Sequence, residues 1–530
     1  MSVKKIIFFF LILTLTFRSQ NFNYNFYKHL EFIASDSTEG RFPGTKGSKI
    51  AANYIVKNLK EIKTLPFWDS SYFQSIPLVS LSPKSETNLI VKNDFLEKSL
   101  VLNQDYVLLH YSLEAIIANY SDLVFVGYGI SSYENDYDDY LGIDVIDKVA
   151  VFLSGSPNNV FFTNNQLTYD DINYKIKNAM AHGAKGCILI PNPKKISKDF
   201  WKYRLFQYQF DKIILAYSLS ENFAIMLNPE KANILFEGSP YSFEEVLNKE
   251  ERNNLSSFKL MSKISFKPKF KENFFLGQNI GGIVKSKKKS DKYIIIGAHY
   301  DGFGIGPPMS GDSIYNGAFD NASGVAMTLE IARYFSINPL NEVNLGFIFF
   351  DGEEQGLLGS TFFCDNISIP LNKILAMVNI DAAALFEETN SFFCVGLEEI
   401  EEVDIFFNAL KKMNLNYAEY MKKIMDGRYF SLSDHFSFQN FGIPSFMIIE
   451  GFDYKYSSVE EGAQRYFEWI LEKYHSPFDD LNQEINLDAA NQYYNVAINF
   501  INEIASKKII NFKKDSQFYS KQRKNSLIKK

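Results

Sequence analysis

The chain has 530 residues, of which 46% are hydrophobic and 22% charged, and its formal net charge is −7. This composition excludes a disordered or fibrous chain, and the acidic balance gives no electrostatic reason to expect nucleic acid as a partner. The length exceeds that of most single domains and predicts two domains.

The N-terminal segment has the pattern of an export signal. Lys4 and Lys5 precede a largely apolar run over residues 6–17, which is too short to span a bilayer comfortably but suits the core of a signal peptide. We therefore predict a signal peptide at 1–19, a periplasmic or extracellular protein, and no stable membrane span after signal removal. An uncleaved membrane anchor is the alternative, and no A-x-A motif marks a cleavage position after the run.

The region after the signal divides into three parts. Residues 20–104 hold two expected helices, 27–35 and 48–63, followed by short strands and turns. Residues 105–225 alternate strands and a helix with Gly at the joins, which favours a small α/β module. Its expected elements are strands at 123–130, 149–153 and 186–191 and a helix at 175–182. Residues 226–274 are a connecting segment.

From residue 275 to 506 the pattern is regular α/β. Nearly continuous apolar runs predict strands that are covered on both faces, at 293–298, 343–350, 374–380 and 444–449. Helices are expected at 321–335, 355–364, 401–413, 460–473 and 487–506. The sequence thus predicts a mixed, mostly parallel sheet with helices on both faces. The last part, 507–530, is basic and polar, and we expect a frayed, solvated end.

Carboxylates and histidines follow these strands at the end where open α/β sheets bind ligands. His299 ends the first strand, and Asp301 could hold its second ring nitrogen. Asp320 lies among small residues at a helix start, where a helix cap is the competing interpretation. Glu353 and Glu354 follow the second strand, and paired carboxylates are costly to bury without a counter-ion. A solvated turn is the alternative there.

Two more positions, one acidic and one a histidine, complete the pattern. Asp381 follows the third strand, where a cap or turn acid is the alternative, and His475 is followed four residues later by Asp479. His435 lies in a similar acidic context. One such match could arise by chance, but their common order along a single α/β pattern indicates a metal site.

The region from about 275 to 505 resembles the di-zinc exopeptidases that include exported leucyl aminopeptidases, glutamate carboxypeptidase II and, more distantly, glutaminyl cyclase. The resemblance extends to the N-terminal helices and to the loop Glu39–Gly40–Arg41. The module at 105–225 resembles the protease-associated domain that is often inserted in these enzymes.

The resemblance implies a site that holds two divalent metal ions, expected to be Zn²⁺. Asp320 would bridge the ions, and Glu353 would be the general base. Asp301 would orient His299, and Tyr474 would stabilise the oxyanion. His435 would lie beside the metals rather than bind them. The implied metal ligands are His299, Asp320, Glu354, Asp381 and His475.

The implied activity is removal of N-terminal residues from peptide or protein substrates. A glutamate-type carboxypeptidase would need a basic residue near the site, for which Arg428 is the candidate. Glutaminyl cyclization and a non-catalytic receptor or adhesion role are further alternatives. Two departures from the family bear on the substrate: Ala382–Ala384 follows Asp381, and 451–474 is longer and more aromatic than usual. The oligomeric state is left open.

Overall fold

The computed structural model describes residues 21–527 except 111–115, 159, 161–168, 198–199, 208–209, 219–221, 382, 384 and 426–431. The predicted signal peptide at 1–19 and the candidate Arg428 lie outside the described residues. So do Ala382 and Ala384. Across the described part of the chain, no helix combines the length and the apolar character that crossing a membrane requires.

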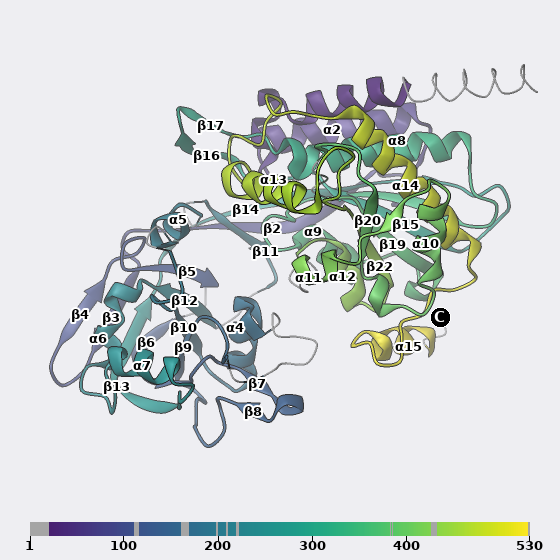
Figure 1. The fold of residues 1–530 in the computed structure, drawn as a ribbon. Helices are drawn as coiled ribbons and strands as arrows, with labels where there is room; N and C mark the ends of the chain where they lie inside the picture. The colour runs from purple at the N-terminus through teal and green to yellow at the C-terminus, as the bar shows by residue number, and fades with distance from the viewer. Residues whose placement is uncertain are drawn as a thin grey trace, which may run out of the picture. The chain divides into compact units, whose positions relative to one another are not determined.

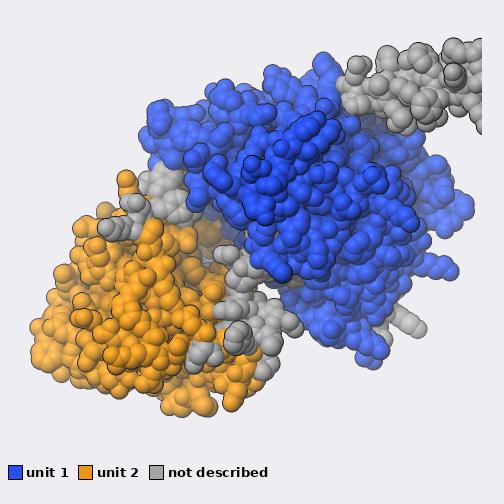
Figure 2. Space-filling view, in the orientation of Figure 1, with its two compact units in different colours: residues 1–77, 275–530 blue, residues 78–274 orange. Residues whose placement is uncertain are grey.

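The chain forms two compact units, coloured separately in Figure 2. Unit 1 comprises Met1–Pro77 and Phe275–Lys530, and unit 2 comprises Leu78–Phe274. Strands β2 (Phe73–Pro83) and β14 (Phe270–Val284) run through the two boundaries. The N-terminal residues therefore belong to the same unit as the predicted peptidase region, although unit 2 separates them in sequence.

A twisted sheet forms the centre of unit 1 (Figure 1). Its strands follow the order β14-β18-β15-β19-β22-β20-β21, in which β18, β15, β19 and β22 are parallel. The mixed, mostly parallel sheet predicted from the sequence is therefore confirmed. The four predicted strands match β15 (Tyr293–His299), β18 (Asn344–Phe350), β19 (Ile374–Asn379) and β22 (Ser445–Glu450). The remaining strands are β1 (Leu65–Pro66), β16 (Gly304–Met309), β17 (Asp312–Tyr315), β20 (Ser391–Val395) and β21 (Asn416–Tyr417).

Helices cover both faces of this sheet. Ile294 and Ile296 of β15 pack into the core that includes the helices on one face, whereas Ile295 packs with Phe363 and Phe438 on the other. The first face carries the helix at 21–33, α2 (Lys46–Glu61), α8 (Ser323–Ile337), α10 (Asp404–Lys411), α13 (Val459–Glu472) and α14 (Leu487–Ser506). The second carries α9 (Leu358–Asp365) and α12 (His435–Asn440). This two-sided burial explains why the strand sequences are almost continuously apolar.

Local capping sets several helix ends. Ser458 and Glu461 form a reciprocal capping box at the start of α13, and the Asn486 side chain accepts from two backbone N–H groups at the start of α14. Both motifs satisfy N–H groups that lack partners inside the helix. The short helix α11 (Met421–Met425) precedes the undescribed residues 426–431.

The C-terminal segment differs from the expectation of a solvated end. Ile510, Phe512 and Phe518 are buried, and helix α15 (Tyr519–Leu527) follows. Phe512 also forms a β-bridge with Ile400. The three apolar side chains pack into the hydrophobic core of unit 1. The basic composition of the segment did not indicate this burial.

Unit 2 contains an eight-stranded sheet in the order β4-β3-β13-β6-β9-β10-β12-β5. It extends beyond the range 105–225 expected for the module, because the flanking strands β3 and β13 hydrogen-bond into the same sheet. The strands of this sheet are β3 (Asn88–Lys92), β4 (Glu97–Leu100), β5 (Tyr106–His110), β6 (Ile117–Phe125), β9 (Val149–Leu153), β10 (Gly186–Ile190), β12 (Phe223–Leu227) and β13 (Phe258–Lys267). Strands β7 (Ser131–Ser132) and β8 (Tyr137–Asp138) pair with each other, and β11 (Lys212–Leu215) pairs with β2. The helices of unit 2 are α4 (Ile172–Ala181), α5 (Phe200–Gln207), α6 (Asn233–Phe236) and α7 (Phe243–Glu251).

Candidate metal centre

The site lies at the carboxyl edge of the parallel strands. β15 pairs in parallel with β18 on one side and β19 on the other, so the residues that follow these strands emerge at one edge. His299 is the last residue of β15, Glu353 and Glu354 follow β18, and Asp381 follows β19. The structure thus brings together three positions that lie far apart in the sequence.

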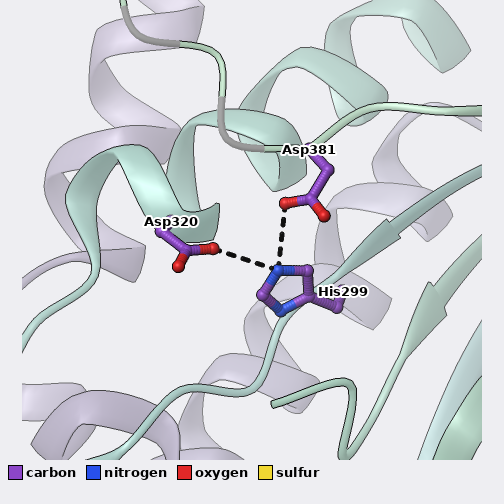
Figure 3. A group of neighbouring side chains, drawn as sticks. All are labelled: His299, Asp320 and Asp381. Carbon is purple, nitrogen blue, oxygen red and sulfur yellow. Dashed lines mark hydrogen bonds and ion pairs between the residues drawn. The ribbon is translucent and has the colours of Figure 1, made fainter. Parts of the chain in front are cut away.

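Asp320 lies between two groups of side chains. Its Oδ1 is 3.3 Å from Nε2 of His299, which is also 3.1 Å from Oδ1 of Asp381 (Figure 3). Its Oδ2 is 3.1 Å from Nε2 of His475, which is 3.3 Å from Oε2 of Glu354. One carboxylate is therefore shared between two histidine–carboxylate groups. The five side chains therefore converge on one place.

The backbone around Asp320 leaves its carboxylate available for this role. Helix α8 begins only at Ser323, and Asp320 itself has φ −117° and ψ 89°, outside the helical region. Asp320 is therefore not the cap of α8, which was the competing interpretation. Gly317 precedes it with a left-handed φ of 58°, and a Cβ there would collide with the carbonyl oxygen of Asp320. Only glycine fits this turn without strain.

The site is almost completely buried. The side chain of His299 is 1% exposed and that of Asp320 is 5% exposed, whereas His475 retains 28%. A cavity of about 10 Å³, which is about the room that one water molecule needs, is lined by Asp320, Glu354 and His475 among others. Solvent therefore reaches the site mainly from the His475 side.

Burial and close charges displace the pKa values of these groups in opposite directions. Burial opposes the positive charge of His475, but the charges of Glu354 and Asp320 and their hydrogen bonds to the ring together outweigh burial and raise the pKa to about 10. Burial also opposes the charge of His299, whose pKa nevertheless rises well above its usual value because of Asp381 and Glu353. Burial and the charge of Asp320 raise the pKa of Glu354 to about 7. Without a metal, the two imidazoles therefore hold protons between the carboxylates.

The donor atoms fit metal ions at the positions of these protons. Three overlapping groups of potential ligand atoms lie within 4.8 Å of one another: His299–Asp320–Asp381, Asp320–Glu354–His475 and His299–Glu353–Glu354. Two ligands of one tetrahedral zinc ion, each about 2.1 Å from it, lie roughly 3.4 Å apart. The nitrogen–oxygen separations of 3.1–3.3 Å in the first two groups are close to this value. Imidazole and carboxylate are also donors that zinc accepts.

Glu353 lies beside His299 and Glu354 without belonging to the two groups that share Asp320. Its side chain is buried, and burial followed by the negative charges of Asp381 and Glu354 raises its pKa well above the usual value, against the opposing charge of His299. A carboxyl group in such an environment binds a proton readily.

Asp301 contacts more of the site than the sequence indicated. Its Oδ1 lies 3.5 Å from Nδ1 of His299, as expected for an orienting carboxylate. In addition, Oδ1 accepts the backbone N–H of Glu353 at 3.0 Å and Oδ2 accepts that of Glu354 at 3.3 Å. One buried carboxylate thus holds both the histidine and the acidic loop.

Asp479 accepts hydrogen bonds from the backbone of the Asp320 loop, as Asp301 does from the loop of Glu353 and Glu354. Its Oδ1 accepts the N–H of Phe319 at 2.9 Å, and its Oδ2 accepts that of Asp320 at 3.0 Å. The sequence marked Asp479 only by its spacing from His475, and that spacing alone did not reveal which loop it holds.

Ser433 and Tyr474 complete the surroundings. The Ser433 hydroxyl donates to Oδ2 of Asp381 and accepts from the amide of Asn379. Tyr474 stacks on His475 with ring centroids 3.7 Å apart, and burial followed by the charges of nearby acids raises its pKa well above the usual value. His435 lies buried at the start of α12 and belongs to none of the ligand groups found among the described residues.

The fold and the shared carboxylate together define a candidate metal-dependent hydrolase. Residues 279–501, the region that carries the site, match the model of peptidase family M28. A 114-residue segment is 37% identical to a protein of Pyrenophora teres f. teres named "Probable zinc metalloprotease", covering 21% of this chain and 24% of that protein. A 92-residue segment is 39% identical to Aminopeptidase YwaD of Bacillus subtilis, covering 17% and 18%.

These matches span about a quarter of the two relatives' own length or less. The fold is shared more widely. The solved aminopeptidase from Aneurinibacillus sp. strain AM-1 superposes with a TM-score of 0.52 and 20% sequence identity, over 91% of this chain and 93% of that one. At this identity the likeness shows a common fold alone.

Proposed function

We propose that the protein is a zinc-dependent aminopeptidase that holds two metal ions and removes N-terminal residues from peptides. The observation that carries the proposal is the position of Asp320, whose two carboxylate oxygens face His299 and His475 separately. One ion would be held by His299, Asp320 and Asp381. The other would be held by His475, Asp320 and Glu354. The names of the similar proteins support zinc and aminopeptidase activity.

In this function some residues would hold the metal ions, others would orient the ligands, and Glu353 would transfer protons. The metal ions, when bound, would lower the pKa of the attacking water and polarise the substrate carbonyl. Glu353 accepts the proton of that water as it attacks the peptide carbon, and later donates it to the leaving amine. The Tyr474 hydroxyl donates a hydrogen bond to the oxygen that becomes negative during attack.

Export through a signal peptide at 1–19 remains part of the proposal. It rests on the lysines and the apolar run at the N-terminus. N-terminal sequencing of the protein recovered from the periplasm or medium would test it. A mature protein that begins after residue 19 is expected, whereas a protein that retains Lys4 would favour the membrane anchor.

A panel of substrates tests the activity. Aminoacyl-nitroanilides should be hydrolysed by the zinc-loaded protein, and N-acetylated versions should not, because an aminopeptidase requires a free amine. A chelator should abolish hydrolysis and added zinc should restore it. Peptides that end in glutamate and peptides that begin with glutamine belong in the same panel.

Each other outcome points to a different function. Release of C-terminal glutamate would indicate a carboxypeptidase, and cyclization of N-terminal glutamine would indicate a cyclase. A folded protein that binds no zinc would refute the metal centre and favour a non-catalytic role. The Glu353→Gln variant, which retains all five proposed ligands, is the matched control for contaminating peptidases.

A further inference from the structure

Arg41 is a buried cation that reaches the frame of the metal centre from the N-terminal part of the chain. It is the last residue of η1 (Asp36–Arg41) and has 0% relative exposure. A charged side chain is costly to bury, so its partners must account for its position.

The Arg41 guanidinium donates to the two loops that carry His299 and Asp320. Nε donates to the carbonyl of Tyr300 at 2.8 Å, directly after His299. On the other loop, Nη1 donates to Asn316 at 2.5 Å and Nη2 to Gly317 at 3.0 Å. Nη1 also donates to the carbonyl of Ile33 at 2.8 Å. A single planar group thus joins three separate segments of backbone.

Charge alone does not explain this placement. Burial lowers the pKa of Arg41 to about 10, although Asp301 and Asp479 oppose the shift, so the group stays positive at neutral pH. A fixed positive charge beside a metal centre repels cations. It also reduces the mutual repulsion of the acids. The feature specific to arginine is therefore the geometry of its donors, which a lysine cannot reproduce.

We propose that Arg41 is a positioning residue that sets the separation of His299 from Asp320 and thereby the affinity of the site for metal. Asp301 and Asp479 hold backbone N–H groups of the loops that carry metal ligands, and Arg41 holds carbonyl oxygens of the His299 and Asp320 loops. The effect on metal affinity requires only that the site binds metal. The effect on turnover rests on the proposed aminopeptidase function.

The test compares Arg41→Lys with the wild-type protein. Lysine retains the charge but loses the planar fork, so a change in metal binding reports geometry rather than charge. Arg333→Lys is the matched control, because Arg333 lies in the same unit and donates to Glu330 away from the site. Zinc content per folded molecule and zinc affinity against a chromophoric chelator are measured first. kcat and KM are then measured at saturating zinc.

In Arg41→Lys we expect zinc affinity to fall about 10- to 100-fold, the range found when groups behind metal ligands are removed. At saturating zinc, kcat should fall about tenfold or more while KM changes by less than about threefold, since substrate contacts are intact. Arg333→Lys should leave all three values unchanged. Wild-type zinc affinity and kcat in folded Arg41→Lys would overturn the proposal.

A second variant decides the question if Arg41→Lys does not fold. In Gly302→Ala, the added Cβ would lie 2.8 Å from the carbonyl oxygen of Gly40 and 3.6 Å from Nη2 of Arg41. It would push the Arg41 loop away from the His299 loop while Arg41 remains. Weaker zinc binding in this folded variant supports the proposal, and unchanged binding refutes it. If wild-type protein binds zinc but hydrolyses no aminoacyl substrate, the proposed function fails while the zinc measurements still test Arg41.

Discussion

Zinc binding should release protons from the site, because the metal ions would take the positions that protons occupy in the metal-free protein. At pH 7 the imidazole of His475 is protonated, since its pKa is about 10, and that of His299 is protonated because its pKa is also raised. An imidazole nitrogen must lose its proton before it can bind a metal. Binding of two ions should therefore displace about two protons from the histidines.

Glu354 adds a smaller contribution. Its pKa of about 7 means that part of its carboxyl groups also carry a proton at pH 7, so the total should exceed the two protons of the imidazoles. Because protons compete with metal, the overall dissociation constant for the pair of ions should rise roughly 100-fold for each unit that the pH falls below the imidazole pKa values.

Calorimetry at pH 7 in two non-chelating buffers of different ionisation enthalpy measures the number of protons released. The His475→Ala variant is the control, and it should release about one proton fewer for the ions that it still binds. If the wild-type protein bound two zinc ions with release of less than one proton, the reasoning from the buried, charged imidazoles would be wrong.

Three substitutions test other parts of the site. Glu353→Gln should retain both metal ions by elemental analysis while kcat falls about 10²- to 10⁴-fold, because the proton acceptor is lost; a fall of less than tenfold would exclude Glu353 as the base. Tyr474→Phe should lower kcat about 10²- to 10³-fold with unchanged zinc content if its hydroxyl stabilises the developing charge, and an unaltered kcat would assign the ring to packing against His475. Asp479→Asn should leave one buried N–H of the Asp320 loop without an acceptor, at a cost of about 1–3 kcal/mol. We expect a lower midpoint of thermal unfolding and weaker zinc binding. Wild-type values for both would show that the loop does not need this carboxylate.

The sequence predicted the parts of the fold that depend on local burial. Strands β15, β18, β19 and β22 were found within about two residues of their ends, because each is covered on both faces and so is apolar throughout. Strands with one exposed face, such as β13, carry alternating patterns that include lysines and were not resolved individually. The C-terminal segment was misjudged because three buried apolar side chains are dispersed among charged residues.

For the site, the sequence could name the converging side chains but, among the groups that support them, only Asp301. His299, Asp320 and His475 were recognisable from residue type and position after strands or helices. Arg41 could not be interpreted in this way, because its partners are backbone carbonyls, which leave no mark in the sequence. Asp479 is a similar case, since both its oxygens accept from backbone N–H groups of a loop distant in the chain.

Unit 1 is built from two separate segments of the chain, which affects how the protein is synthesised and how it can be shortened. Arg41 leaves the ribosome long before His475, and all of unit 2 is synthesised between the first segment of unit 1 and its sheet. The N-terminal segment must therefore wait, incompletely packed, for the strands that it will join. A shorter protein should be made by removing residues within 78–274 and joining β2 to β14. Removing residues from the N-terminus instead would remove Arg41 and its hydrogen bonds to the His299 and Asp320 loops.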